Sequence, residues 1–387
     1  MSHYKGGELL GKGSYGCVFS PSIPCNSSRK PDPKQVSKVF FHSKSKEKIK
    51  QEYAMNQLIR KITGHERWAV TMETRCKPPP YQTMFDYDPS ILVCLENAKK
   101  TSEEFDKTRS MLIGDKSETT LYSYFIKHYT YQVISQPKVF TRMFVETMKL
   151  FDSLFVGLCA LHQSKICHLD IKDDNIVLDK GSLKYIDFGL AGQIQNQSVF
   201  KQRSEYVFQT NSVYVAYPLE FIFLFASKSK LHDELQRIHQ GNLRNYFMEY
   251  QYIHEFILGR PDPSKYPVSL LQTMISQKPP YREVIRKIDT YSLGMLLPSL
   301  LHKVGVEYDM YETVLRLIQL PKVKPFMKLF KLMTDPDCKS RISPKQAREL
   351  YLKLKSRYLQ RKQKKTRRDR KKRTTKKKHT TKKRSKR

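Results

Sequence analysis

The clearest chemical signal in the sequence is an octet that runs from His168 to Asn175 and reads His-Leu-Asp-Ile-Lys-Asp-Asp-Asn. Twelve residues after Asn175, Asp187 opens an Asp-Phe-Gly tripeptide. Phosphoryl transfer needs a carboxylate that orients the acceptor hydroxyl and takes its proton, a cation beside the γ-phosphate, and oxygen ligands that hold Mg²⁺ against the phosphates. Asp170, Lys172, and the pair Asn175 and Asp187 supply these groups in that order. The pattern therefore indicates phosphoryl transfer from ATP in the presence of Mg²⁺.

A second pattern, over residues 11–18, is rich in glycine and reads Gly-Lys-Gly-Ser-Tyr-Gly-Cys-Val. Glycine lets backbone amides approach phosphate oxygens with no Cβ in the way. The spacing alone is weak evidence, since a tight hairpin also needs glycine. Here it lies between two strand-like runs, which favours a loop that covers ATP phosphates over a dinucleotide site. The predicted ATP contacts in this region are Leu10, Gly11, Lys12, Gly13, Ser14, Tyr15, Gly16 and Val18.

Lys38 lies in the short apolar run 36–41, which is rich in β-prone residues. A single lysine in such a strand usually faces solvent. Because Lys38 follows the glycine-rich hairpin and precedes a helix predicted over 43–62, it can instead pair with the α- and β-phosphates of ATP.

The helices and strands around these motifs must position the turns and loops that carry them. Residues 144–162 carry apolar side chains spaced by three and four, which predicts an amphipathic helix just before the octet. Residues 175–178 and 183–186 are two short β-prone runs on either side of an Asp-Lys-Gly turn. Residues 65–136 give no clear pattern, and the remainder of the chain to about residue 359 is mainly helical in pattern.

With these motifs the chain resembles a eukaryotic-type protein kinase across roughly residues 5–358. The resemblance implies an α+β, bilobal fold with ATP in the cleft between a small β-rich N-lobe with one main helix (about 5–128) and a larger α-helical C-lobe (about 129–358). It also implies that Asp170 is the catalytic base and that Glu52 pairs with Lys38. Lys172, two residues after the base, is the serine/threonine-type arrangement and favours a protein substrate with serine or threonine.

Other residues match positions with structural roles in that family. They are His168, Phe188, Gly189, Glu220, Asp289 and Arg341. Asp289, in Asp-Thr-Tyr-Ser-Leu-Gly, is similar to the aspartate of the central C-lobe helix that braces the catalytic loop. Glu220, in Tyr-Pro-Leu-Glu, resembles the end of the activation segment, and Arg341 matches the arginine that pairs with that glutamate.

Leu169 departs from the family pattern, since many kinases carry an arginine there that binds a phosphorylated activation segment. We therefore expect activity without phosphorylation of this segment. The hydroxyl groups concerned are those of Ser198, Ser204, Tyr206, Thr210 and Ser212.

Two further departures concern packing. Asn56, four residues after Glu52, stands where an apolar side chain usually stacks toward Phe188. Either Met55 takes that place or the register of the helix differs. An insertion over about 225–280, with helical patterns, either packs on the C-lobe or shapes substrate docking.

The composition is strongly basic, with a formal net charge of +34. Residues 361–387 contain 18 Lys and Arg and a single acid, and too few apolar residues to bury a core, so we expect 359–387 to be a disordered tail. Such a tail would bind nucleic acid or another polyanion through counterion release, or act as a nuclear-localisation signal. It has no aromatic residue for base stacking, which disfavours base-specific recognition.

Seven cysteines without a Cys-x-x-Cys pair suggest neither a disulfide framework nor a zinc site. No apolar run is long enough to span a bilayer. These features predict an intracellular protein, cytoplasmic or nuclear, and we expect a monomer. The compact sequence, the Tyr-Pro-x-Glu segment and the basic tail are also similar to kinases of large DNA viruses, which would place the chain in a host cell or virion.

Two other functions stay open. A small-molecule phosphotransferase of the kinase fold shares the Asp-to-Asn loop, but usually lacks the glycine-rich loop, the lysine two residues after the base and an intact Asp-Phe-Gly, all present here. A pseudokinase scaffold, tethered to nucleic acid by the tail, would have lost a phosphate or metal ligand, and none is lost.

Overall fold

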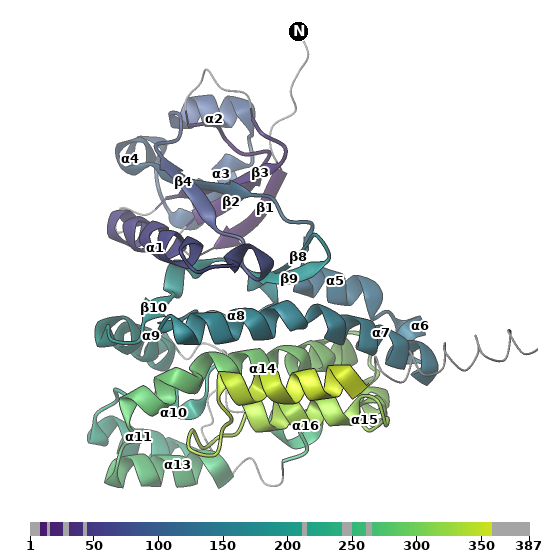
Figure 1. Ribbon diagram of the computed structural model, residues 1–387. Coiled ribbons are helices and arrows are strands. Elements are labelled where there is room, and N and C mark those ends of the chain that lie inside the picture. Colours follow the sequence, from purple (N-terminus) through teal and green to yellow (C-terminus); the bar gives the residue numbers. More distant parts are fainter. Residues whose placement is uncertain are drawn as a thin grey trace, which may run out of the picture.

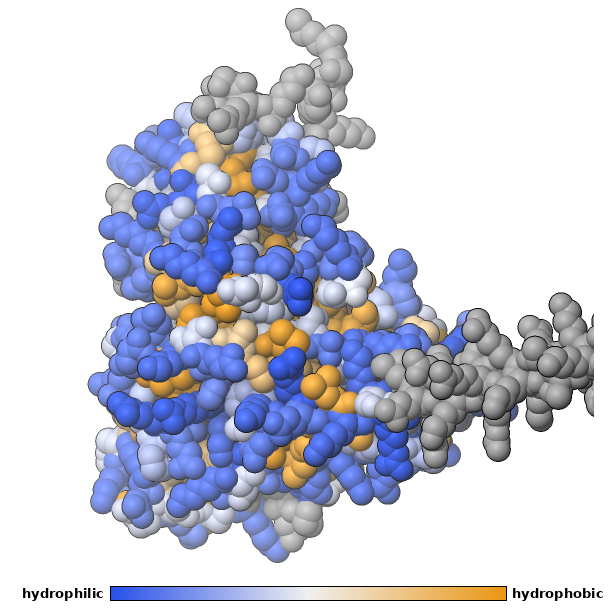
Figure 2. Space-filling view, viewed as in Figure 1, coloured by the Kyte–Doolittle hydropathy of each residue, from blue (hydrophilic) through white to orange (hydrophobic). Residues whose placement is uncertain are grey.

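The computed structural model describes residues 8–13, 16–25, 31–41, 45–210, 215–241, 250–260 and 265–357. These residues form two lobes, one built on a β-sheet and one on helices (Figure 1), which confirms the predicted bilobal α+β fold. The face of the molecule in Figure 2 is largely hydrophilic, and hydrophobic residues gather chiefly around the waist where the lobes meet.

The N-lobe contains a five-stranded antiparallel sheet. Its strands are β1 (Glu8–Gly13), β2 (Gly16–Ser20), β3 (Gln35–Phe40), β4 (Met72–Cys76) and β5 (Ser110–Asp115), in the spatial order β1-β2-β3-β5-β4. Successive side chains of a strand point to opposite faces, so Val39 and Phe40 lie in different core clusters. Phe40 packs in a cluster with Ile49 of α1 (Ser45–Arg60), the helix predicted to follow β3.

Three short helices between β4 and β5 cover the other face of this sheet. They are α2 (Tyr81–Tyr87), α3 (Ile91–Ala98) and α4 (Ser102–Thr108). Leu95 and Phe105 from these helices share a core cluster with Phe19 and Val39 of the sheet. With at most eight residues each, the helices are too short for the sequence to show a helical period, which is why residues 65–136 gave no clear pattern.

Two disulfides cross-link the N-lobe, so the expectation that the chain has none was wrong. Cys17 of β2 is bonded to Cys94 of α3, and Cys25 to Cys76 at the end of β4. The partners are 77 and 51 residues apart in the chain, so only the tertiary structure of the N-lobe brings them together. The other three cysteines of the chain are buried as free thiols.

The C-lobe is helical and contains the larger core. Its main helices are α5 (Leu121–His128), α6 (Tyr131–Ile134), α7 (Pro137–Leu150), α8 (Asp152–Gln163), α14 (Tyr281–Glu307), α15 (Tyr311–Ile318), α16 (Lys324–Met333) and a final helix over 344–357. α14 lies between α8 and α16 (Figure 1). A Cβ on Gly294 of α14 would come within 2.7 Å of the Cβ of Met333, so only glycine lets α14 and α16 approach this closely.

Two expected boundaries change in the C-lobe. The helix predicted over 144–162 is divided between α7 and α8, which meet at Phe151. Leu121 and Phe125 of α5 are buried, and α5 contacts β8 and α14 of the C-lobe. We therefore place the boundary between the lobes in the connection after β5, rather than near residue 128.

The insertion predicted over about 225–280 contains α11 (Lys228–His239), a π-helical turn (Ile253–Ile257) and α13 (Lys265–Ser276). Leu231, Ile253 and Leu271 of these helices are buried in the C-lobe core, which favours the packing role over the docking role. Among the described residues, no helix is both long and apolar enough to cross a bilayer.

The two disulfides should make N-lobe stability depend on redox conditions. A disulfide that closes a long loop stabilises the folded state by about 2–4 kcal/mol, chiefly by restricting the unfolded chain. We expect a reductant to lower the urea unfolding midpoint of the wild type, and to leave unchanged that of a Cys76→Ser/Cys94→Ser variant, which lacks both bonds. Equal wild-type midpoints with and without reductant would contradict this cross-linking.

Candidate active site

The predicted catalytic and metal-binding residues lie where the two lobes meet, on turns at the ends of short strands. The octet follows β7 (Ile166–Cys167), and its last three residues form a 3-10 turn that leads into β8 (Ile176–Asp179). β8 and β9 (Ser182–Tyr185) pair as the antiparallel hairpin that the sequence predicted. Asp187 lies two residues after the end of β9, so one hairpin has the octet before it and Asp-Phe-Gly after it.

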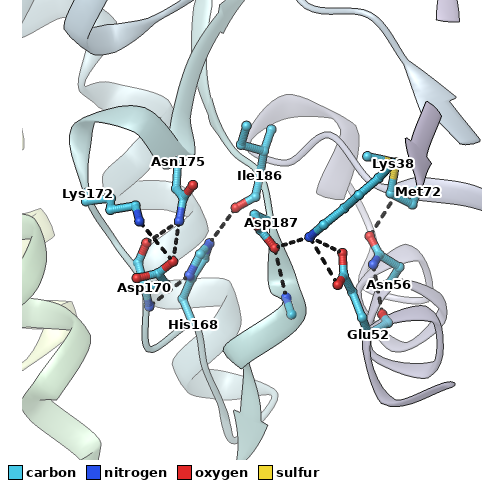
Figure 3. A network of polar contacts seen from close by, with 11 residues as sticks. Lys38, Glu52, Asn56, Met72, His168, Asp170, Lys172, Asn175, Ile186 and Asp187 are labelled. Atoms are coloured by element: carbon cyan, nitrogen blue, oxygen red, sulfur yellow. Dashed lines mark hydrogen bonds and ion pairs between the residues drawn. The ribbon is translucent and has the colours of Figure 1, made fainter. Parts of the chain in front are cut away.

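Lys38 of β3 joins the two lobes through its ammonium group (Figure 3). Its Nζ lies 2.9 Å from Oε1 of Glu52 in α1 and 2.8 Å from Oδ1 of Asp187. The structure thus brings together the lysine, the helix glutamate and the first residue of Asp-Phe-Gly.

These three charges control one another's protonation. Burial alone would lower the pKa of Lys38, but the charges of Asp187 and Glu52 outweigh burial and raise it above its ordinary value. Burial raises the pKa of Glu52, and Lys38 offsets part of that rise. Enclosure between the lobes would raise the pKa of Asp187, but the charge and hydrogen bond of Lys38 bring it below its ordinary value. Lys38 and Asp187 therefore carry full charges near neutral pH.

Asn56 holds α1 against the sheet by hydrogen bonds rather than by apolar contact. Its buried amide accepts a hydrogen bond from the Met72 N–H of β4 at 2.8 Å and donates one to the Glu52 carbonyl oxygen at 2.8 Å. Met55 is buried in the same core cluster as Phe188. The ion pair of Glu52 with Lys38 shows that the register of α1 is the one expected from the sequence.

The backbone of the catalytic loop is fixed from the C-lobe core. Asp289 of α14 accepts hydrogen bonds from the N–H of His168 at 2.6 Å and from the N–H of Leu169 at 3.1 Å. The His168 ring lies 3.0 Å from the Ile186 carbonyl oxygen through Nε2, and its Nδ1 lies 3.3 Å from the Asp170 N–H. These partners require a proton on Nε2 and a lone pair on Nδ1. The ring thereby connects the loop to the strand that precedes Asp187.

Asp170 is held by its neighbours in the octet (Figure 3). Asn175 donates through Nδ2 to the Asp170 carbonyl oxygen at 3.0 Å and to its carboxylate Oδ2 at 2.6 Å. Nζ of Lys172 lies 3.5 Å from the same Oδ2. A fixed carboxylate with a cation beside it is suited to orient a hydroxyl group and to stabilise charge on a transferred phosphoryl group.

The donor set fits Mg²⁺ only together with phosphate. Within the described ranges, no cluster of three or more His, Cys, Asp or Glu side chains could hold a metal ion alone. The amide oxygen of Asn175 points away from Asp170 in Figure 3, and Asp187 supplies a carboxylate. Two hard oxygen ligands suit Mg²⁺, which usually completes its coordination with substrate phosphates and water.

The glycine-rich region forms the hairpin of β1 and β2. A Cβ on Gly16 would collide with the carbonyl oxygen of Val39 in β3, so this glycine is required by sheet packing. A Cβ on Gly11 would meet nothing within 4 Å. Leu10, Gly11, Lys12, Gly13, Gly16 and Val18 lie on these two strands, and Ser14 and Tyr15 lie outside the described residues.

Glu220 and Arg341 form a buried ion pair at the end of the activation segment. Glu220 lies in α10 (Leu219–Ile222), and an Arg341 nitrogen bonds its carboxylate. Arg341 also donates through Nε to the Asp335 carbonyl oxygen at 2.8 Å, and its guanidinium lies 5.0 Å from the ring centre of Tyr291 in α14. This pair fixes the segment end to the helix that also carries Asp289.

One functional element is absent from the sequence-based prediction. Residues after Asp-Phe-Gly form β10 (Gly192–Gln193), which pairs with β7, and then helix α9 (Gln197–Thr210). Phe200, Ser204 and Val207 of α9 are buried, and their spacing of four and three is the signal that could have revealed it. α9 brings Arg203 to within 3.9 Å of Asp170.

Comparisons with known proteins agree with this geometry. The family model described as protein kinase domain matches residues 4–217. In Saccharomyces cerevisiae, CTD kinase subunit alpha is 42% identical over 55 residues, which are 14% of this chain and 10% of that protein. MAP kinase kinase kinase SSK2 is 52% identical over 44 residues, 11% of this chain and 3% of that protein. The chain thus spans only a small part of the length of these relatives.

Proposed function

This chain belongs to the protein kinase family, and from that premise we propose that it transfers the γ-phosphate of ATP to serine or threonine hydroxyls of a protein. The observation that carries the proposal is the group formed by Lys38, Glu52 and Asp187, assembled beside a braced Asp170. These contacts support the proposed roles of Lys38 as the phosphate-binding lysine, of Asp187 as a metal ligand and of Asp170 as the base.

Each of these residues has a defined task in the proposed reaction. Lys38, kept in place by Glu52, would bind the α- and β-phosphates. Asn175 and Asp187 would hold Mg²⁺, which supplies positive charge at the phosphates. Asp170 would orient the acceptor hydroxyl and accept its proton, while Lys172 stabilises negative charge on the transferred group.

Serine/threonine specificity rests on Lys172 and on one relative. Lys172 places its ammonium group beside the carboxylate of the proposed base, the arrangement found in serine/threonine kinases. The yeast protein named serine/threonine-protein kinase SSK22 is 56% identical over 39 residues, 10% of this chain and 3% of that protein. Both support serine or threonine as the acceptor.

Activity without phosphorylation of the segment is part of the proposal. Leu169 is fully buried in the C-lobe core and offers no cation to a phosphate. Ser204 is buried on α9 and donates a hydrogen bond to the Ile222 carbonyl oxygen at 3.1 Å, so its hydroxyl already has a structural partner. Ser198, Tyr206 and Thr210 also lie on α9, and Ser212 lies outside the described residues.

Residues 359–387 also lie outside the described part of the chain. We propose that their positive charge binds nucleic acid or another polyanion without sequence specificity. We also propose a monomeric state and an intracellular location, although the two disulfides remove the support that the cysteine pattern gave to a reducing compartment.

Removing the proposed base or metal ligand should abolish transfer. Asp170→Asn and Asp187→Asn should each lower the rate by about 10²-fold or more. The measurement is transfer of labelled γ-phosphate from ATP with Mg²⁺ to casein, histone and a panel of small alcohols, and the exposed Asp233→Asn variant is the control. Full activity in both variants would contradict the mechanism, and transfer to small alcohols alone would favour a small-molecule phosphotransferase.

Phosphatase treatment should leave the activity intact. With no arginine at position 169 to bind a phosphate, the treated chain and a Ser198→Ala/Tyr206→Phe/Thr210→Ala variant should retain rates within about threefold of the untreated wild type. Mass spectrometry would establish the phosphorylation state before each kinetic run. A strict requirement for a phosphate on the segment would contradict this part of the proposal.

A further inference from the structure

Helix α9 is fixed to the C-lobe by buried contacts, so the side chains that it presents are held in place. Phe200 and Val207 are buried, and the Phe200 ring lies 5.9 Å from that of Tyr281 in α14. On the other side, the rings of Phe208 and Phe223 lie 5.7 Å apart. Arg203 lies between these anchoring residues in the sequence, and its side chain is 17% exposed.

Arg203 contacts the catalytic loop in two ways. Its Nη2 lies 3.9 Å from Oδ1 of Asp170, on the oxygen opposite the one that Asn175 and Lys172 face. Its Nε donates a hydrogen bond to Oη of Tyr217 at 2.8 Å, and its guanidinium lies 5.4 Å from the centre of that ring.

Tyr217 connects Arg203 to the backbone of the catalytic loop. The buried hydroxyl donates a hydrogen bond to the carbonyl oxygen of Leu169. Burial raises the pKa of Tyr217 above its ordinary value, so the hydroxyl keeps the proton that it donates. Arg203 and Tyr217 thus form one chain of hydrogen bonds from α9 to the residue before Asp170.

Leu169 needs such contacts because its backbone is in the left-handed region, with φ of 61°. This conformation is unfavourable for a leucine and persists only where the surroundings impose it. Asp289 of the C-lobe core accepts a hydrogen bond from the N–H of Leu169, and Tyr217 of the activation segment donates one to its carbonyl oxygen. These two hydrogen bonds therefore help to set the direction in which the side chain of the next residue, Asp170, points.

We propose that Arg203 is a positioning residue that holds the catalytic loop through Tyr217 and Asp170, and so takes the place of a phosphate-binding arginine in the loop. Compared with the usual arrangement, the positions of the charges are exchanged: the cation, Arg203, is on the activation segment, and the carboxylate that it faces, Asp170, is on the catalytic loop. This arrangement needs no phosphate. The inference rests on the proposed kinase function and extends it by assigning the means of control.

The surroundings favour positioning over a blocking role for Arg203. With α9 in this place, Lys38 is paired with both Glu52 and Asp187, and Asn175 is bonded to Asp170. The arrangement that transfer requires therefore coexists with the Arg203 contacts.

The test compares Arg203→Ala, Arg203→Lys and Tyr217→Phe with Arg237→Ala, an exposed arginine on α11, as the control. Phosphate transfer to casein is measured with the full chain while ATP is varied. Because the loop would lose its orientation and the ATP-binding residues are untouched, Arg203→Ala should lower kcat by about 10²-fold with little change in KM for ATP. Added methylguanidinium should restore part of the kcat of Arg203→Ala and none of that of Tyr217→Phe.

Further outcomes separate this inference from the function on which it rests. The double variant Arg203→Ala/Tyr217→Phe should lose less activity than the product of the two single losses, because the two side chains share a hydrogen bond and support the same loop. An unchanged or increased kcat in Arg203→Ala would overturn the inference, as would a rise in KM for ATP together with a lower unfolding temperature. A wild type without any transfer would overturn the proposed function itself.

Discussion

The ammonium group of Lys38 is bonded to one carboxylate from each lobe, Glu52 of α1 and Asp187 after β9. A largely buried cation is costly unless its partners are charged and well placed, and removal of either partner would leave the other charges uncompensated. The pairing therefore sets the position of α1 against the sheet and of the N-lobe against the C-lobe. Asn56 supports it by accepting a hydrogen bond from Met72 of β4 and by donating one to the Glu52 carbonyl oxygen within α1.

The catalytic loop depends on a second set of bonds, all directed at its backbone. Asp289 holds two N–H groups from the core, and Tyr217 holds the Leu169 carbonyl group from the activation segment. The leucine at position 169 buries its side chain in the core, where an arginine would need a charged partner. In the proposed arrangement, the buried leucine and the Arg203 contact complement each other, because the loop is held by side chains of the segment and not by a phosphate.

The sequence predicted the site better than the elements around it. Asp170, Asn175 and Asp187 belong to short motifs whose spacing is fixed by one hairpin, and Lys38 and Glu52 lie on a strand and helix with recognisable patterns. The disulfide of Cys17 and Cys94 could not be predicted because the two cysteines are far apart in the chain. The helices α2 to α4 could not be predicted because each is only about two turns long. The role of Arg203 could not be predicted because a single arginine on a helix belongs to no motif. Only the packing of α9 brings it close to Asp170.

Kinetic analysis of Lys38→Met on the folded, phosphatase-treated chain tests the central claim most directly, with Lys34→Met as the control. Lys34 is exposed in the turn before β3, so its loss removes the same charge without touching the lobe contact. If the ammonium group of Lys38 aligns ATP with the C-lobe, Lys38→Met should lower kcat/KM by about 10²-fold or more, and Lys34→Met should match the wild type. Wild-type kcat/KM in Lys38→Met would contradict the account.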